Sequence, residues 1–313
     1  MDAICAEQLT KSFGDILAVH AISFHVAEGE IFGLVGPDGA GKTTTIRMLA
    51  GILEPTAGNA WVAGHHVIAQ AEALKPLIGY MSQQSGLYGD LTVLENLRFF
   101  ADIHNVPRKQ RAEAIHRLLA FTNLAPFGRR LVAHLSGGMK QKLALACALV
   151  HSPRVLLLDE PTCGVDPVSR RDFWRLLSQL LRARVTVLLS TAYLDEAERC
   201  HHLGLIHQGQ LLACGKPDEL RRLMPGYILE LRTPQPRQAA KVLRQALPPD
   251  TVALFGDRLH VHTTHPEHDI HHIRNHLAAA DITLSAARIV EPSLEDVFVT
   301  VLGRPHPSTP PDC

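Results

Sequence analysis

The chain has 313 residues, of which 46% are hydrophobic and 20% are charged. This composition is typical of a globular protein that buries a large core, and the length suffices for two domains. The 31 basic residues equal the 31 acidic residues in number. Because no excess of basic charge attracts a polyanion, we do not expect nucleic acid as a partner.

The sequence also argues against a chain that crosses a membrane by itself. Its longest apolar runs, such as residues 143–150, fall far short of the roughly 20 residues that a spanning helix needs. The N-terminus lacks the basic start and apolar core of a secretory signal. Six scattered cysteines without a Cys-x-x-Cys pair favour reduced thiols over disulfides or a zinc site. We therefore expect a cytoplasmic protein that reaches a membrane only through a partner.

The first segment of the chain alternates strand-like runs with turns, and we expect strands at residues 5–9, 18–26 and 31–35. A glycine-rich stretch follows the third strand and leads into a helical pattern at residues 44–50. It consists of Gly36, Pro37, Asp38, Gly39, Ala40, Gly41, Lys42, Thr43 and Thr44. A glycine, four residues and then Gly-Lys-Thr between a strand and a helix form the pattern of a phosphate loop, which we prefer to a chance match.

The chemistry of phosphate binding explains the spacing in this loop. Glycines allow consecutive backbone N–H groups to converge on phosphate oxygens at a helix N-terminus. Lys42 supplies a positive charge for the β- and γ-phosphates. Thr43 offers a hydroxyl to Mg²⁺, a cation that prefers oxygen ligands. The sequence therefore predicts a site for a nucleotide with Mg²⁺.

Two residues outside the loop are candidates that need support from their surroundings. Phe13, which precedes a glycine, could stack on an adenine ring, although a phenylalanine is more often a core residue. Gln83 follows a short apolar strand and could ligate Mg²⁺ or orient water, but by itself it would be a solvated loop residue. Beyond it, residues 93–124 have helical apolar spacing, which indicates an inserted helical subdomain at about residues 90–150.

A second candidate anion site begins another helix. Ser136, Gly137 and Gly138 precede a strongly apolar helix that runs to residue 150. Backbone N–H groups and the helix dipole favour an anion at such a place. The alternative is a serine that only caps its own helix.

Two adjacent carboxylates end a continuous apolar strand at residues 155–158. Such a strand is typical of the buried centre of a parallel sheet. Asp159 can join the ligands of Mg²⁺, and Glu160 can take a proton from the attacking water or orient it. Solvated loop acids are the weaker alternative, because four buried aliphatic residues precede them.

In this order, the motifs of residues 1–222 resemble those of the ATPase subunit of an ATP-binding cassette (ABC) transporter. The match includes the phosphate loop, Gln83, the segment Leu135-Ser136-Gly137-Gly138-Met139, which is similar to the family signature, and the strand before Glu160. The resemblance implies an α/β fold of the P-loop NTPase class with an inserted helical subdomain. It also implies ATP and Mg²⁺ as cofactors.

The resemblance further implies a role for each matching residue. The residues implied for catalysis are Glu160, Gln83 and Lys42, and those implied for Mg²⁺ are Thr43, Gln83 and Asp159. The residues implied for nucleotide binding are Phe13, Gly36, Pro37, Asp38, Gly39, Ala40, Gly41, Lys42, Thr43, Thr44, Ser136, Gly137, Gly138 and Asp166. In this family two subunits dimerise head to tail, so Ser136 and Gly138 of one face the γ-phosphate held by Lys42 of the other, and the loop with Asp166 contacts the opposite subunit.

The same resemblance implies the partners: an integral membrane permease and a second ATP-binding cassette, which is the same chain or a different one. It places the protein on the inner face of the cell membrane, as the subunit that powers an exporter of drugs or other small amphipathic molecules. One alternative is a soluble ABC protein without a transport role, but such relatives usually carry two cassettes or a long coiled-coil insertion. Another is an ATP sensor with low turnover.

One departure from the family pattern bears on turnover. The family usually has a histidine after the strand at residues 185–189, where it donates a hydrogen bond to the γ-phosphate, and this chain has Ala192. Losing one such donor typically lowers turnover by ~10²–10³. We expect an active enzyme whose hydrolysis is slowed, or one site of an asymmetric pair.

The last quarter of the chain reads as a separate small domain. Over residues 223–303 we expect an α+β, ferredoxin-like sandwich, with strands at residues 227–231, 252–255, 259–262 and near 282–284 and helices between and after them. The segment from Glu291 to Phe298 resembles the closing motif of drug-export ATPase subunits. Residues 304–313 are rich in proline, and we expect them to be disordered.

Histidines are frequent in this domain. His268, His272 and His276 recur at four-residue spacing and would share one helix face, which could bind a transition metal. No cysteine or acidic residue completes a fixed ligand set, so we favour a solvated polar face.

Overall fold

The computed structural model describes residues 2–84, 86–224, 226–248 and 251–302. The chain forms two compact units, of which the first ends at Cys214 and the second begins at Gly215. The boundary expected after residue 222 lies earlier in the chain, because helix α8 (Pro217–Arg222) contacts helix α11 (Leu294–Leu302) of the second unit. Among the described residues, no helix combines the length and apolarity needed to span a bilayer. The expected disordered tail lies outside the described residues.

A six-stranded sheet in the order β10-β9-β3-β8-β7-β6 forms the centre of the first unit. Its strands are β3 (Ile31–Val35), β6 (Ile78–Met81), β7 (Val155–Asp159), β8 (Thr186–Thr191), β9 (His202–His207) and β10 (Gln210–Gly215). The strands from β9 to β6 pair in parallel, and β3, β7 and β8 are buried along their whole length. Because parallel strands end at the same edge of a sheet, the segments after β3, β6, β7 and β8 meet there.

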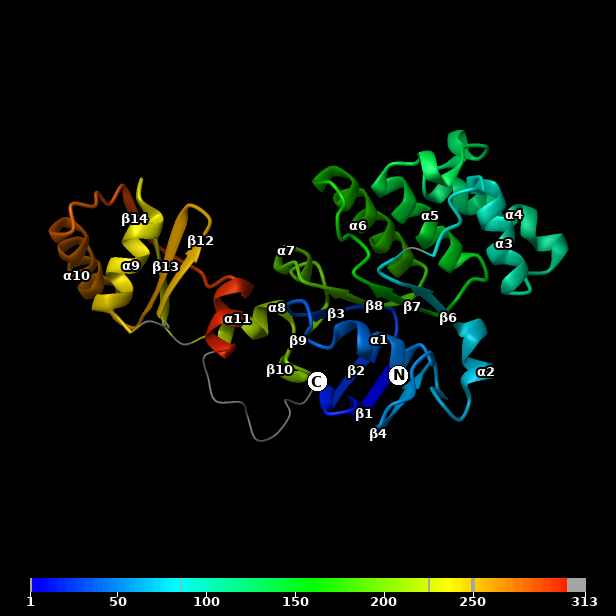
Figure 1. The fold of residues 1–313 in the computed structure, drawn as a ribbon, viewed down its shortest axis with the longest axis horizontal. Helices are drawn as coiled ribbons and strands as arrows, with labels where there is room; N and C mark the ends of the chain where they lie inside the picture. Colours follow the sequence, from blue (N-terminus) through cyan, green and yellow to red (C-terminus); the bar gives the residue numbers. More distant parts are fainter. Residues whose placement is uncertain (1, 85, 225, 249–250, 303–313) are drawn as a thin grey trace. The chain divides into compact units, whose positions relative to one another are not determined.

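Layers of structure cover both faces of this sheet (Figure 1). On one side lie helix α1 (Lys42–Leu49) and a second sheet in the order β2-β1-β4-β5. Its strands are β1 (Asp2–Phe13), β2 (Ile16–Ala27), β4 (Ala57–Val62) and β5 (His65–His66). On the other side lie helices α5 (Gly137–Leu149) and α6 (Pro167–Arg182). Phe24 of β2 stacks on Phe32 of β3 with ring centroids 5.2 Å apart, so the two sheets share one core.

The helical subdomain contains α3 (Val93–Ile103), α4 (Arg108–Phe121) and α5. A capping box between Thr92 and Glu95 begins α3. Asn96 is fully buried and donates to the carbonyls of Tyr88 and Thr92, which fixes the loop before the helix. The segment 93–124, for which helical structure was expected, forms two helices. The chain turns between them at Asn105, which has a positive φ of 52°. The remaining short helices of this unit are α2 (Ala71–Leu74), α7 (Leu194–Ala197) and the 3₁₀ turns at Lys75–Leu77, Ala125–Phe127 and Val132–His134.

The second unit has an antiparallel sheet in the order β12-β13-β11-β14. Its elements are β11 (Tyr227–Arg232), α9 (Pro236–Ala246), β12 (Val252–Phe255), β13 (Arg258–Thr263), α10 (Pro266–Ala279) and β14 (Ala286–Val290), followed by α11. Helices α9 and α10 pack against one face of the sheet, where Leu229, Leu243 and Ile273 are buried together. The order of the first six elements is β-α-β-β-α-β.

The prediction of a strand near residues 282–284 is wrong, because these residues lie between helix α10 and strand β14. Ile282 is 3% exposed and its N–H donates to the Leu277 carbonyl, so this residue closes helix α10 and fills the core instead of extending a strand. The strand β14 begins four residues later, at Ala286, and pairs with β11. Its residues are mostly exposed, which is why apolar content did not reveal it.

The closing motif attaches helix α11 to the other face of this sheet. Ser293 and Asp296 form a reciprocal cap, in which the Ser293 N–H donates to the Asp296 carboxylate and the Asp296 N–H donates to the Ser293 hydroxyl. The second oxygen of Asp296 lies 2.8 Å from Nδ1 of His260 on β13. Burial opposes the charged form of Asp296, but the hydrogen bonds from His260 and Ser293 outweigh it and lower the pKa of this carboxyl. The motif therefore anchors a helix.

Two stacked histidines lie between the helical subdomain and the central sheet. The rings of His104, at the end of α3, and His151 have centroids 3.8 Å apart and lie within 9° of parallel. His151 Nε2 lies 2.8 Å from the Ile78 carbonyl oxygen, and among the described residues its buried Nδ1 has no hydrogen-bond partner. Burial, reinforced by repulsion from His104, lowers the pKa of His151 to about 4. The stack therefore requires neutral rings.

We predict that the first unit loses stability as the pH falls from 6.5 to about 4. The unfolded chain binds a proton on His151 near pH 6.5, but the folded chain does so only near pH 4, so stability that is present above this window is lost within it. Trp61 and Trp174, the two tryptophans of the chain, lie in the first unit, so their fluorescence during urea unfolding measures it. His151→Gln should flatten the pH dependence. His116→Gln, at an exposed position of α4, should not, and equal slopes for both variants would contradict the prediction.

Candidate functional site

The segments after the parallel strands surround a pocket of about 240 Å³. It is lined by Ala18, Asp38, Gly39, Ala40, Gly41, Lys42, Thr43, Thr44, Gln83 and Glu160. The expected phosphate loop thus forms one wall, and Gln83 and Glu160 come to it from the ends of β6 and β7. The candidates nearest to the phosphate loop are brought together in one place.

The loop has the geometry of an anion site at a helix N-terminus. Helix α1 begins at Lys42, and Gly41 before it has a φ of 103°, a conformation that L-residues rarely adopt. Gly36 must also be glycine, since a Cβ there would lie 2.0 Å from the Ile206 carbonyl oxygen. Among the residues that the structure describes, no side chain caps the first turn of α1, so its N–H groups are available to phosphate oxygens.

Lys42 is the buried cation of the pocket, with a side chain that is 3% exposed. Its Nζ donates to the carbonyls of Gly36 and Pro37 at 2.8 and 2.9 Å and lies 3.1 Å from Oε1 of Glu160. The second oxygen of Glu160 accepts from Gln83 Nε2 at 2.9 Å. The three residues expected to be catalytic therefore form one connected chain of polar contacts.

The residues expected at the metal also meet. Thr43 Oγ1 donates to Oδ1 of Asp159 at 2.9 Å, and Ser190 Oγ donates to the same oxygen at 2.7 Å. Oδ2 of Asp159 is buried and, among the described residues, has no hydrogen-bond partner. A buried anionic oxygen without a donor is costly, so its position beside a threonine hydroxyl fits a hard divalent cation such as Mg²⁺.

Glu160 has a strained backbone, with a φ of 47°. A non-glycine residue in this region costs about 1–3 kcal/mol and persists only where surrounding contacts hold it. The Glu160 N–H donates to Ser190 Oγ at 2.9 Å, and its carbonyl accepts from the Cys163 N–H at 3.1 Å. The carboxylate is therefore held at the pocket by its backbone as well as by Lys42.

Other candidates lie away from this pocket. Phe13 ends strand β1, is 49% exposed and has Lys11 Nζ 5.3 Å from its ring centroid. Ser136 caps α5 by accepting from the Met139 N–H, and a Cβ at Gly138 would lie 2.3 Å from Ser169 Oγ. Asp166 caps α6 by accepting from two N–H groups, and these hydrogen bonds lower its pKa. Neither these residues nor Gly137 line the pocket within one chain.

At the end of β8, Ala192 occupies the position expected for a histidine. The preceding Thr191 accepts the Gly36 N–H at 3.3 Å, which joins this strand to the phosphate loop. The Ala192 side chain is exposed and carries no donor.

Comparison with known proteins identifies the family. The family model for ABC transporters matches residues 19–163. The Nod factor export ATP-binding protein I of Burkholderia pseudomallei (strain 1710b) is 38% identical over 302 residues, which cover 95% of this chain and 96% of that protein. The chain belongs to the ABC transporter family and is an ATPase cassette of it.

A second relative matches this ABC cassette over part of its own length. The probable multidrug ABC transporter ATP-binding protein YbhF of Escherichia coli (strain K12) is 49% identical over 230 residues. The match covers 74% of this chain but 40% of YbhF, so the cassette corresponds to less than half of that relative.

Solved structures agree with the fold of the cassette. A structure described as the ATP binding subunit of an ABC transporter has a TM-score of 0.64 and 29% identity and covers 71% of this chain and 92% of its own. CbiO1 of Clostridium perfringens, described as part of the ABC transporter complex cbiONQ, has a TM-score of 0.65 and 25% identity, covering 70% and 90%. These matches support the P-loop NTPase fold class with its α/β sheets.

Sequence reasoning missed two residues of the site. Ser190 touches both Asp159 and the backbone of Glu160, but it is not among the residues expected at the site. A polar residue at the end of a buried apolar strand was the available signal. Ala18 lines the pocket, and a Cβ on Gly41 would lie only 2.5 Å from the carbonyl oxygen of Ala18. A backbone contact of this kind leaves no signal in residue type.

We predict that Ala192→His increases ATP turnover by the cassette. The imidazole would add a donor beside the phosphate loop, and a donor of this kind is worth up to ~10²–10³ in turnover. Steady-state phosphate release measures the change. Ala192→Phe, which adds a ring without a donor, is the matched control. A variant with histidine that is no faster than the parent chain would refute the idea that Ala192 slows hydrolysis.

Proposed function

We propose that this chain is the ATP-binding and ATP-hydrolysing subunit that powers an ABC-type exporter through ATP-driven dimerisation. The observation that carries the proposal is the chain of contacts from Lys42 through Glu160 to Gln83 beside the phosphate loop. The names of two relatives, a probable multidrug ABC transporter ATP-binding protein and a Nod factor export ATP-binding protein, support export of a drug or another small amphipathic molecule.

In the proposed mechanism, residues of one cassette position the nucleotide and the attacking water. The loop N–H groups and Lys42 hold the phosphates, and ATP must displace the carboxylate of Glu160 from the ammonium. Thr43, Gln83 and Asp159 would hold Mg²⁺, which would supply positive charge to the phosphates. The released Glu160 carboxylate then orients the water and polarises it.

A second cassette, the same chain or a different one, completes each site in this proposal. Ser136, Gly137 and Gly138 form a helix N-terminus that lies outside the pocket of their own chain, which suits a contact with the γ-phosphate of the partner. Asp166 begins α6 in the loop that would contact the opposite cassette. Phe13, exposed at the end of β1, would stack on the adenine.

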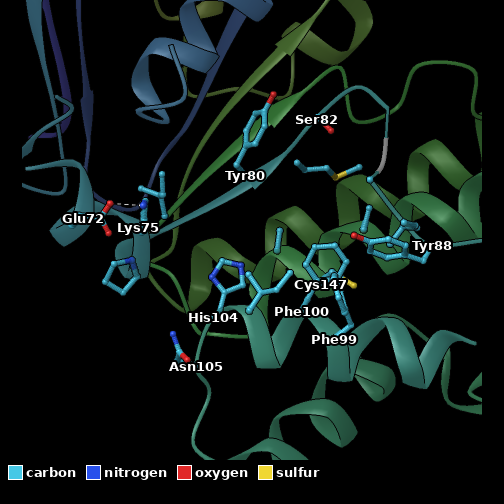
Figure 2. A pocket seen from close by; sticks show the side chains of 18 residues that line it. Glu72, Lys75, Tyr80, Ser82, Tyr88, Phe99, Phe100, His104, Asn105 and Cys147 are labelled. Atoms are coloured by element: carbon cyan, nitrogen blue, oxygen red, sulfur yellow. Dashed lines mark hydrogen bonds and ion pairs between the residues drawn. The ribbon is translucent and has the colours of Figure 1, made fainter. Parts of the chain in front are cut away.

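The permease would bind a groove beside the helical subdomain. This cavity of about 730 Å³ is lined by aromatic side chains from two elements, among them Tyr80 of β6 and Phe99 and Phe100 of α3 (Figure 2). It also includes Ser82, which adjoins Gln83, so an occupant can influence the contact between Gln83 and Glu160. An apolar helix end of an integral membrane permease fits such a groove and would hold the cassette at the inner face of the membrane.

The second unit belongs to the same proposal as an accessory or regulatory domain over residues 223–303. Its β-α-β-β-α-β order supports the ferredoxin-like assignment. Helix α10 exposes His268 and His272 one turn apart, with their Nε2 atoms 3.2 Å from each other. In the part of the chain that the structure describes, no group of three histidines, cysteines or carboxylates is arranged to hold a metal.

We predict that Glu160→Gln traps an ATP-bound dimer. The amide keeps the size of the side chain but cannot accept a proton from water, so ATP binds and is not hydrolysed. Size-exclusion chromatography with light scattering, with and without Mg-ATP, measures the dimer. Lys42→Ala is the control, because it should stay monomeric with ATP. A Glu160→Gln variant that also stays monomeric would contradict dimerisation by ATP.

We predict that Ile103→Asp abolishes recovery of the permease in a pull-down from gently solubilised membranes, analysed by mass spectrometry. Ile103 lines the groove and is 55% exposed, so the aspartate should not unfold the cassette. A bound permease would bury the new carboxylate without a partner charge, which opposes docking. Ile52→Asp, 60% exposed and outside the groove, is the matched control and should keep the partner. Loss of a polytopic membrane protein in both variants, or in neither, would contradict docking in the groove.

A further inference from the structure

A buried carboxylate outside the nucleotide pocket connects two of the loops that build it. Glu196, on the short helix α7 after β8, is 1% exposed. Its Oε1 accepts from Thr162 Oγ1 at 2.5 Å, and its Oε2 accepts from Thr191 Oγ1 at 2.9 Å. Both threonines are 2% exposed. The two oxygens of one side chain therefore bridge the loop after β7 and the end of β8.

A cation on a third element, helix α6, lies beside the negative charge of Glu196. Nε of Arg170, on α6, lies 3.4 Å from Oε1 of Glu196, and its guanidinium lies 4.2 Å from the ring centroid of Tyr193. A buried carboxylate with a cation and two hydroxyl donors is held in one position. A carboxylate left alone at this depth would destabilise the fold.

The two threonines are joined to groups that act on the nucleotide. Thr162 lies two residues after Glu160, whose φ of 47° needs support from neighbouring contacts. The carbonyl of Thr191 accepts the N–H of Gly36 at the start of the phosphate loop. One side chain thus connects the catalytic carboxylate to the loop that holds the phosphates.

We propose that Glu196 is a positioning residue for hydrolysis: its bridge between Thr162 and Thr191 holds the backbone of Glu160 in the conformation that directs the carboxylate at the water. The inference rests on the proposed ATPase function. Glu196 itself does not line the nucleotide pocket, so it acts through the two threonines and leaves ground-state binding of ATP unaffected.

The full-length chain tests this with Thr162→Val and Glu196→Gln, assayed for ATP turnover, KM for Mg-ATP and tryptophan-monitored unfolding. Thr162→Val is isosteric and removes one hydroxyl from the bridge. We expect kcat to fall by about tenfold in each variant with KM within about twofold, which is the pattern of an interaction needed only in the transition state. The double variant should be no slower than the slower single variant, because both changes break the same contact.

Two control variants separate positioning from packing. Thr162→Ser keeps the hydroxyl and should keep kcat near that of the parent chain. Thr122→Val removes the hydroxyl of another threonine that is 1% exposed, bonded to the Leu118 carbonyl in α4, and should leave kcat unchanged.

The outcomes distinguish the inference from the function on which it rests. Unchanged kcat in Thr162→Val, or independent and multiplicative losses in the double variant, would overturn the role of Glu196 while the parent chain still hydrolyses ATP. A parent chain without turnover under the same conditions would overturn both the proposed function and the inference.

Discussion

The buried ion pair between Lys42 and Glu160 is the interaction that holds the strand ends together around the nucleotide pocket. Two charges removed from water are tolerated only when hydrogen bonds satisfy their remaining groups. Here the carbonyls of Gly36 and Pro37 accept hydrogen bonds from the ammonium of Lys42, and Gln83 donates a hydrogen bond to the second carboxylate oxygen of Glu160. These groups come from the ends of β3, β6 and β7, so the pair forms only when the parallel strands lie in this order.

The parts of the site that occupy contiguous sequence could be predicted. The phosphate loop is recognisable because its strand, glycines, lysine and helix are adjacent, and Asp159 is recognisable because four buried aliphatic residues precede it. Contacts between strands could not be predicted in this way. Ser190 reaches Asp159 because β7 and β8 pair with these two residues opposite each other, and Glu196 reaches Thr162 through the same pairing. Sequence spacing carries no information on that register.

The fold shows the same division between local and distant information. Strands β3, β7 and β8 follow from continuous apolar runs, because strands buried on both faces need them. Strands β9 and β10 were not identified in the sequence, although β9 completes the sheet beside β3. In the second unit, apolar residues near Ile282 suggested a strand, but apolar character alone does not distinguish a chain that fills a core after a helix from one that joins a sheet.

Strand β14 has a consequence for the solubility of the second unit. It is the last strand of its sheet, and backbone groups on the outer edge of such a strand can template pairing with another chain. The strand is only five residues long, and it carries Arg288, whose guanidinium binds Glu230 on the neighbouring strand. A short edge with a fixed charge resists growth by further strands. The weak apolar pattern that conceals β14 in the sequence is thus also what protects the sheet from aggregation.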